Sequence, residues 1–264
     1  MRIIYHTEKV NKKNKGVKFM INIVIPMAGA GSRFAKAGYT KPKPFIDVLG
    51  KPMICHVLDN LNMPNAKFIL LARAEHYNNE QETVNWIKAH YNVEFILIDK
   101  LTEGAACTVL HAHRLLNNDT PMLIANSDQI VDMDIADYIN DSDERGLDGS
   151  VLCFEDNDKK WSYAKLDENG MITMIREKEV ISEHATVGIY YFKRGCDFIE
   201  NAIDMFVRND RVNNEFYVAP VYNYAIKRGE KFGIYSIDKT QMHGTGTPED
   251  LDKYINFVKQ GAMV

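Results

Sequence analysis

Apolar runs alternate with stretches of helical periodicity along the first half of the chain. Four short apolar runs predict buried strands: Ile21–Pro26, Lys67–Ala72, Val93–Ile98 and Pro121–Ala125. Apolar residues at helical spacing predict helices between them: one that begins near Pro52, one over Glu80–His90 and one over Ala105–Leu116. Because strands and helices alternate, we expect parallel strands with right-handed crossovers and helices on both faces of the sheet.

The second half of the chain has a different pattern, in which short strands are separated by turn signals such as Asn169-Gly170. The predicted strands are Ser150–Phe154, Tyr163–Leu166, Met171–Ile175, Ala185–Phe192 and Lys231–Ile237. The predicted helices are Asp197–Arg208, Val218–Arg228 and Asp250–Val258. A brief extended piece is also expected at Phe45–Val48. With no repeat or low-complexity linker, the pattern indicates one α/β domain with a mixed sheet.

The composition narrows the class of protein. The chain has 264 residues, 45% hydrophobic and 26% charged, with a net charge of −4, which is ordinary for a soluble globular protein. This charge provides no broad basic field for nucleic acid, and no apolar run reaches the length of a membrane span. The four cysteines are widely scattered, which disfavours a disulfide framework or zinc site and favours a reducing cytoplasm.

Residues 1–19 stand apart from the rest because they are rich in lysine and lack a long apolar stretch. This pattern disfavours a secretory signal. We expect residues 1–19 to be a disordered or non-native extension before a natural start at Met20, and residues 20–264 to form the single domain.

The segment IPMAGAGSRFAKAGYTKPKPF, residues 25–45, combines a glycine-rich turn with a cluster of cations behind a predicted strand. Glycine amides can converge on anionic oxygens, while Arg33 offers a planar fork and Lys43 a compact charge for phosphate. The segment contains no GxxxxGK[ST] and lacks the third small residue of a dinucleotide fingerprint. It therefore predicts a polyphosphate site of another kind, with an ordinary turn and solvated lysines as the alternative.

Several segments in order resemble the sugar nucleotidyltransferases, the family of glucose-1-phosphate thymidylyltransferases and related pyrophosphorylases. They are PMAGAGSRF, KPKPFIDVLGKPMI, EGAACTVLHA, IANSDQ, IREKEV, ATVGIYYF and GTGTPEDL. The resemblance implies a three-layer Rossmann-like (GT-A-like) mixed sheet with helices on both faces. It also implies transfer of a nucleotide from an NTP to a sugar 1-phosphate or similar phosphorylated acceptor, with release of pyrophosphate, for surface polysaccharide synthesis.

The resemblance also implies roles for particular residues. The nucleotide half, about residues 20–135, would bind the NTP through Ala28, Gly29, Ala30, Gly31, Ser32, Glu103 and Gly104. Arg33, Lys43 and Asp128 are the catalytic candidates, and Asp128 would bind a Mg²⁺ cofactor. The acceptor half, about residues 136–264, would use Tyr163, Glu177, Lys178, Thr186 and Glu215. Lys36 and Lys41 match the family less well and are interpreted as solvated charges. Many relatives are oligomers, so a homo-oligomer is also an expectation.

The sequence departs from the family at its second metal ligand. The thymidylyltransferases have an aspartate where this chain has Gly244, which cannot ligate through a side chain. Asp128 with phosphates and water, or another carboxylate such as Glu103 or Asp238, would then hold the ion. Two alternatives stay open: a GT-A-type glycosyltransferase that uses Asp132 and Asp134 as a DxD motif, and a non-catalytic nucleotide-binding homologue.

Overall fold

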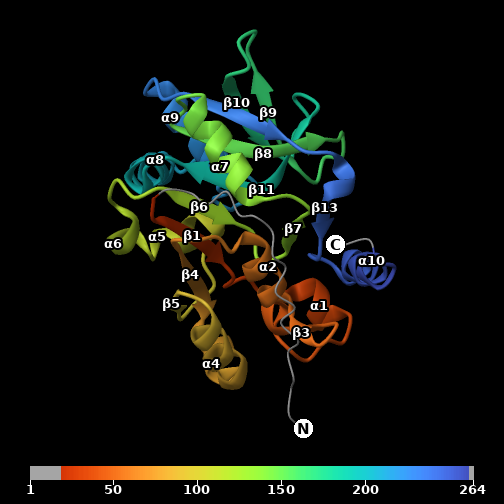
Figure 1. Ribbon diagram of the computed structural model, residues 1–264. Coiled ribbons are helices and arrows are strands. Elements are labelled where there is room, and N and C mark those ends of the chain that lie inside the picture. Colours follow the sequence, from red (N-terminus) through yellow and green to blue (C-terminus); the bar gives the residue numbers. More distant parts are fainter. Residues whose placement is uncertain (1–18, 262–264) are drawn as a thin grey trace.

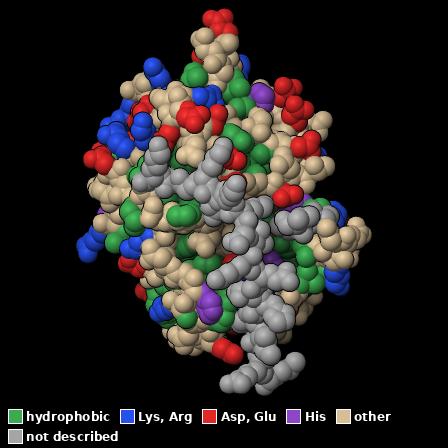
Figure 2. All heavy atoms as spheres, viewed as in Figure 1, with side chains coloured by type: hydrophobic (Ala, Val, Ile, Leu, Met, Phe, Trp, Pro, Cys, Tyr) green, Lys and Arg blue, Asp and Glu red, His purple; other side chains and the backbone are tan. Residues whose placement is uncertain are grey.

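The computed structural model describes residues 19–261 of the chain (Figure 1). The expected N-terminal extension, residues 1–19, lies outside the described residues except for Phe19. No helix within residues 19–261 combines the length and apolar character that crossing a bilayer requires. On the face drawn in Figure 2, acidic side chains lie among the basic ones, which agrees with the small net charge.

A nine-stranded mixed sheet forms the centre of the fold, and its main path runs β10-β9-β11-β6-β1-β4-β5. The parallel part consists of β1 (Ile21–Pro26), β4 (Ala66–Arg73), β5 (Val93–Ile98) and β6 (Met122–Ala125). The antiparallel part consists of β8 (Gly149–Glu155), β9 (Ser162–Leu166), β10 (Ile172–Glu177) and β11 (His184–Phe192), and β12 (Phe232–Ser236) pairs in parallel with β8. Strand β11 joins the two parts through antiparallel pairing with β6, which confirms the predicted mixed sheet.

Helices cover both faces of this sheet. Successive residues of a strand point to opposite sides, so one strand contributes to a buried cluster on each face. In β1, Ile23 and Ile25 pack into one buried cluster while Val24 packs into the other. The first cluster receives α2 (Met53–Leu61), α4 (Gln81–His90), α7 (Ile135–Glu144) and α10 (Pro248–Lys259). The second receives α5 (Ala105–Leu110), α6 (His113–Leu116), α8 (Gly195–Val207) and α9 (Tyr222–Lys227). The predicted three-layer, Rossmann-like architecture is therefore confirmed.

Some predicted elements differ from the observed ones. The helix predicted over Ala105–Leu116 is two helices, because the amides of His111 and Ala112 bond three residues back and tighten the turn between them. Phe45 ends a 3₁₀ turn, η1 (Lys43–Phe45), and only Asp47–Val48 is extended, as β2, which pairs with β3 (Lys51–Pro52). The sequence reasoning also missed α1 (Ser32–Lys36), α3 (Ala74–Asn79), α7, η3 (Lys239–Gln241), β7 (Gln129–Val131) and β13 (Met242–Gly244).

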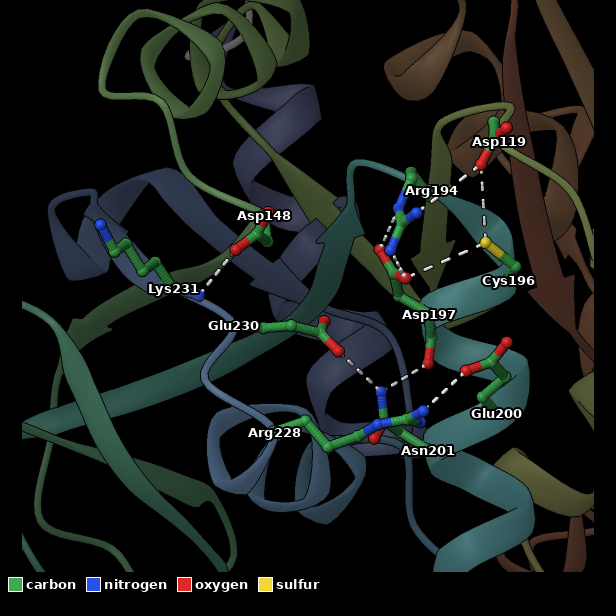
Figure 3. Close-up of polar contacts among 10 residues, drawn as sticks. All are labelled: Asp119, Asp148, Arg194, Cys196, Asp197, Glu200, Asn201, Arg228, Glu230 and Lys231. Atoms are coloured by element: carbon green, nitrogen blue, oxygen red, sulfur yellow. Dashed lines mark hydrogen bonds and ion pairs between the residues drawn. The ribbon is translucent and has the colours of Figure 1, made fainter.

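A polar cluster anchors the start of helix α8 (Figure 3). Arg194 donates to both carboxylate oxygens of Asp197, at 3.0 Å from Nε and 2.5 Å from Nη2. The fully buried Asn201 donates through Nδ2 to the Asp197 carbonyl oxygen at 2.7 Å and to Glu230 Oε1 at 3.3 Å. These bonds tie α8 to the segment between α9 and β12, and they serve the fold.

Candidate active site

The glycine-rich loop leaves the carboxyl end of β1, the edge where open α/β sheets bind their ligands. Gly29 and Ala30 are exposed, and no hydrogen-bond partner of their amides is found among the described residues. Gly31 adopts φ 61° and ψ 24°, a left-handed conformation that favours glycine. A Cβ atom on Gly31 would lie 3.4 Å from Lys43 Cβ, so the loop packs directly against Lys43.

The four cations behind this loop have different surroundings. Arg33 and Lys36 are exposed on α1, and no ion pair of either is found within residues 19–261. Lys41 forms an ion pair with Glu80 at 3.5 Å. Lys43 alone of the four turns inward, with its side chain 21% exposed. This arrangement supports the interpretation of Lys36 as a solvated charge, and it leaves Arg33 open to a ligand.

Lys43 and Asp128 meet although 85 positions separate them in the chain. Lys43 Nζ donates to Asp128 Oδ2 at 2.5 Å, and the Asp128 side chain is only 18% exposed. Asp128 follows β6, whose carboxyl end lies beside that of β1 in the parallel sheet. Two of the three predicted catalytic residues are thus brought together beside the glycine-rich loop.

The segment that follows β13 holds Asp128 in place from the other side. Thr245 donates from its amide and its hydroxyl to the Asp128 carbonyl oxygen, at 2.8 and 3.1 Å. A Cβ atom on Gly246 would come within 2.8 Å of Asp128 Oδ2, so this glycine leaves room for the carboxylate. Gly244 lies opposite Gln129 in the β7–β13 pair. Gly244 thus directly precedes Thr245, the residue that bonds to the Asp128 carbonyl oxygen.

The site offers one carboxylate to a metal ion. No cluster of three or more His, Cys, Asp or Glu side chains suited to a metal occurs among the described residues. The two carboxylates considered as substitutes are engaged elsewhere: Glu103 pairs with Arg211 at 2.9 Å, and Asp238 accepts from the Thr240 amide at 2.8 Å. A single carboxylate still fits Mg²⁺, which proteins commonly bind through one or two carboxylates together with substrate phosphates.

The glycine of the Glu103–Gly104 loop has a packing reason that the sequence did not reveal. Gly104 has φ 124°, and a Cβ atom there would lie 2.4–2.9 Å from three backbone atoms of Phe216. The Phe216 amide donates to the Glu103 carbonyl oxygen at 2.7 Å, and the Ala106 amide donates to the Phe216 carbonyl oxygen at 3.1 Å. Residue 104 must be glycine for this contact, whether or not a base lies over the loop. The Thr102 hydroxyl is engaged inside the loop with Thr108 Oγ1 at 2.6 Å.

A pocket of about 230 Å³ lies beside this loop and between the two halves of the chain. Its lining includes the predicted acceptor residues Glu177 and Thr186. It also includes residues that the sequence reasoning missed: Asn126, Lys160, Trp161, Ser162, Tyr190 and Tyr217. Tyr163 does not line the pocket, because its side chain is fully buried and β9 pairs with β10 and β11 at this position. The order of residues along one strand does not reveal which of their side chains face a cavity.

Glu177 is the carboxylate in the lining of this pocket. Ser162 Oγ donates a short hydrogen bond to Glu177 Oε2, and Thr186 Oγ1 lies 3.2 Å from the Tyr190 hydroxyl. Burial raises the pKa of Glu177 above its ordinary value of 4.5, although the Ser162 bond and the Lys178 charge oppose this. The result is a carboxylate that can accept hydrogen bonds from a ligand and that titrates closer to neutrality than a solvated one.

Lys178 is held next to the pocket in a left-handed conformation, with φ 57°. Its Nζ donates to the Tyr217 hydroxyl at 2.7 Å. Burial alone would lower the pKa of Lys178, but the Tyr217 bond and the charges of Glu177 and Glu215 raise it. Lys178 thus stays cationic beside Tyr217, a residue of the pocket lining, and could meet an anionic group of a ligand there.

The DxD alternative is not supported by the surroundings of its aspartates. Asp134 caps helix α7, with its Oδ1 accepting from the Ala136 amide at 3.0 Å. The Asp132 amide donates to the Gln241 carbonyl oxygen, and Gln241 Nε2 donates to the Asp132 carbonyl oxygen, each at 2.8 Å. Both bonds use the backbone of Asp132. One carboxylate of the pair, that of Asp134, therefore serves a helix start.

The chain is similar to several known proteins. Residues 22–261 match the family model described as "Nucleotidyl transferase". The chain is 27% identical over 179 residues to the mannose-1-phosphate guanylyltransferase catalytic subunit beta of Dictyostelium discoideum, which covers 64% of this chain and 48% of that protein. It is 24% identical over 242 residues to the UTP–glucose-1-phosphate uridylyltransferase AglF of Haloferax volcanii, which covers 87% of this chain and 93% of that protein.

The chain spans less than half the length of several curated relatives that it matches, the Dictyostelium protein among them. A crystal structure of a nucleoside-diphosphate-sugar pyrophosphorylase from Vibrio cholerae RC9 superimposes with a TM-score of 0.75 at 24% identity. The superposition covers 89% of this chain and 99% of that one, which shows a shared fold.

Proposed function

Because this chain belongs to the nucleotidyl transferase family, we propose that it joins an NTP to a sugar 1-phosphate or similar phosphorylated acceptor and releases pyrophosphate. The observation that carries the proposal is the Lys43–Asp128 pair, which lies against the glycine-rich loop and close to the 230 Å³ pocket. Asn126 lines the pocket and Asp128 follows two residues later, so nucleotide and acceptor would meet at the end of β6.

In this proposal the chain acts by positioning and by charge. An oxygen of the acceptor phosphate attacks the α-phosphorus of the NTP, the bond from that phosphorus to the bridging oxygen breaks, and pyrophosphate leaves with the electron pair. Lys43 neutralises charge that develops at the α-phosphoryl oxygens, and Arg33 stabilises the leaving group. Lys178 orients the acceptor phosphate, and the glycine-rich loop holds the NTP in line. No nucleophilic side chain is required.

Asp128 is the residue that would hold a Mg²⁺ ion, together with phosphate oxygens and water. When bound, the ion supplies positive charge that offsets the charge of the phosphates. We propose Mg²⁺ because its ordinary demand for one or two carboxylates matches what the site contains. The proposed nucleotide half, about residues 20–135, supplies Arg33, Lys43 and Asp128, and the acceptor half, about residues 136–264, supplies Lys178 and most of the pocket.

The relatives named for mannose 1-phosphate and glucose 1-phosphate support a sugar phosphate as the acceptor. We propose a role in surface polysaccharide synthesis. We propose the cytoplasm as the location, since the four thiols are free and two of them, Cys55 and Cys153, are buried in the core. The deciding experiment is a matrix of CTP, UTP, dTTP and GTP against a panel of sugar phosphates, read by pyrophosphate release. Turnover with one or more pairs is expected. Binding of an NTP without turnover for any pair would favour the non-catalytic alternative.

Acceptor binding is expected to depend on the protonation of Glu177. Its pKa is raised by burial, so the carboxylate is charged above this raised pKa and becomes neutral as the pH falls through it. A charged carboxylate accepts stronger hydrogen bonds than a neutral carboxyl group. The KM for the acceptor substrate should therefore rise about tenfold as Glu177 is protonated. The check is KM for the acceptor between about pH 5 and pH 8. In Glu177→Gln the KM should be high at every pH, and a pH profile identical to wild type would contradict the assignment.

Gly244→Asp is expected to strengthen metal binding, because it restores a carboxylate at the position where the resemblance places the second metal ligand. The substitution should fold, since φ at Gly244 is not positive and its Cβ would meet only the side-chain amide of Gln129, at 3.7 Å from Oε1 and 4.0 Å from Nε2. We expect the Mg²⁺ concentration for half-maximal rate to fall about tenfold, as ligand charge tunes the affinity of such sites. Gly244→Asn, which adds the same bulk without charge, is the matched control. An unchanged Mg²⁺ titration in Gly244→Asp would place residue 244 away from the ion.

A further inference from the structure

A tight hairpin lies between helices α8 and α9 and carries the residues that reach the pocket. Val212 and Glu215 exchange both backbone hydrogen bonds, at 3.0 and 2.9 Å. The two residues between them, Asn213 and Asn214, have φ values of 49° and 63°. Two-residue hairpin turns with positive φ at both central positions match the strand twist and favour asparagine. The sequence VNNE therefore fixes the direction in which Glu215, Phe216 and Tyr217 leave the turn.

One side of this hairpin contacts the Glu103–Gly104 loop, which the resemblance assigns to NTP binding. Arg211 Nη2 lies 2.9 Å from Glu103 Oε2, and the guanidinium stacks at 4.2 Å over the ring of Phe216. The same guanidinium donates to Asn209 Oδ1 at 2.6 Å and to the Asn214 carbonyl oxygen at 3.3 Å. Its planar fork thus joins the two arms of the hairpin to Glu103, which a lysine could not do at all of these points.

The other side of the hairpin reaches the acceptor pocket. Directly after Phe216, whose backbone bonds hold the Glu103–Ala106 segment, Tyr217 lines the pocket and accepts the hydrogen bond from Lys178 Nζ. From the same segment, the negative charge of Glu215 helps to raise the pKa of Lys178. Of two consecutive residues, Phe216 therefore contacts the Glu103–Gly104 loop and Tyr217 contacts the pocket proposed for the acceptor.

We propose that Arg211 is a positioning residue that locks this hairpin against the Glu103–Gly104 loop and thereby fixes the spacing between the nucleotide and the acceptor. This inference rests on the proposed function for the identity of the two ligands. Arg211 itself touches neither ligand in the proposal. It acts through Glu103 on one side and through Phe216 and Tyr217 on the other.

Amide hydrogen exchange on the full chain tests the lock without any substrate. In Arg211→Ala, exchange at the amides of Ala106 and Phe216 should become about tenfold faster, from loss of an ion pair and a cation–π contact. Arg211→Lys keeps the charge and should give an intermediate rate. Amides of the central strand β1 should exchange as in wild type, which separates loss of the lock from loss of the fold. Wild-type exchange at Ala106 and Phe216 in Arg211→Ala would overturn the proposal.

Kinetics give a second reading that a merely structural role would not produce. With the NTP and sugar phosphate that turn over fastest in the matrix, Arg211→Ala should raise both KM values about fivefold or more, since both sites lose alignment. Arg208→Ala is the matched control, because that guanidinium lies over Tyr224 at 5.9 Å and not at Glu103. In Arg211→Ala, KM values equal to wild type for both substrates would contradict the proposal. If no substrate pair turns over in wild type, the proposed function fails, while the exchange experiment still decides the lock.

Discussion

Replacing Asp128 with asparagine is expected to lower kcat by about two orders of magnitude or more. The amide keeps the shape of the side chain but loses the charge that pairs with Lys43 at 2.5 Å. The ammonium of Lys43 would then lack its fixed counter-charge, and the site would lose the carboxylate proposed to hold Mg²⁺. The measurement is pyrophosphate release at saturating NTP and acceptor, with circular dichroism to show that the variant is folded.

Asp132→Asn is the matched control for this variant. It removes the same charge four residues further along, where the described contacts of Asp132 with Gln241 run through its backbone. We expect its kcat to stay within about threefold of wild type, as for a substitution outside the reacting centre. Turnover of Asp128→Asn close to wild type, with the control unaffected, would remove Asp128 from the mechanism.

Arg33→Ala is expected to reduce kcat by about a hundredfold, through loss of charge stabilisation on the departing pyrophosphate. Arg33 is exposed, and no hydrogen bond or ion pair of its guanidinium is found between residues 19 and 261. The free energy of unfolding should therefore change by no more than about 0.5 kcal/mol. Single-turnover kinetics with the best substrate pair, together with a thermal melt, separate the two effects.

Lys36→Ala serves as the comparison for Arg33→Ala, since Lys36 is exposed on the same helix α1, three residues later. It should leave kcat near the wild-type value. Equal and small losses in the two variants would mean that this part of the loop provides only general positive charge, and Arg33 would lose its assigned role.

The strands were predictable because buried parallel strands are short, continuous apolar runs. Ile21–Pro26 has the predicted bounds, and β4 and β6 differ from the prediction by a residue at an end. Val93–Ile98 also has the predicted bounds, but the prediction that it is buried was wrong: β5 is an edge strand in which only Ile98 is buried. Short elements were not predictable, because three-residue strands such as β7 and β13 show too little periodicity to stand out. The division of the helix over Ala105–Leu116 depends on backbone bonds at His111 and Ala112 that leave no apolar signature.

The candidate site was predictable only in part. The resemblance indicated both Lys43 and Asp128, and the structure shows that they touch. Trp161, just before β9, and Ser162, its first residue, were missed because their approach to the pocket depends on how β9 pairs with β10 and β11, which no local pattern encodes. Gly104 was predicted as part of the NTP site, and its contact with Phe216 could not be foreseen because these residues are far apart in the chain.

The most direct test of the account is a crystal structure of the protein with the NTP that supports turnover, together with Mg²⁺. We expect the triphosphate to lie along residues 29–32, with its phosphate oxygens within hydrogen-bond reach of Arg33 and Lys43 and its metal ion at Asp128. A triphosphate bound elsewhere on the chain, with Lys43 still paired only to Asp128, would contradict the account.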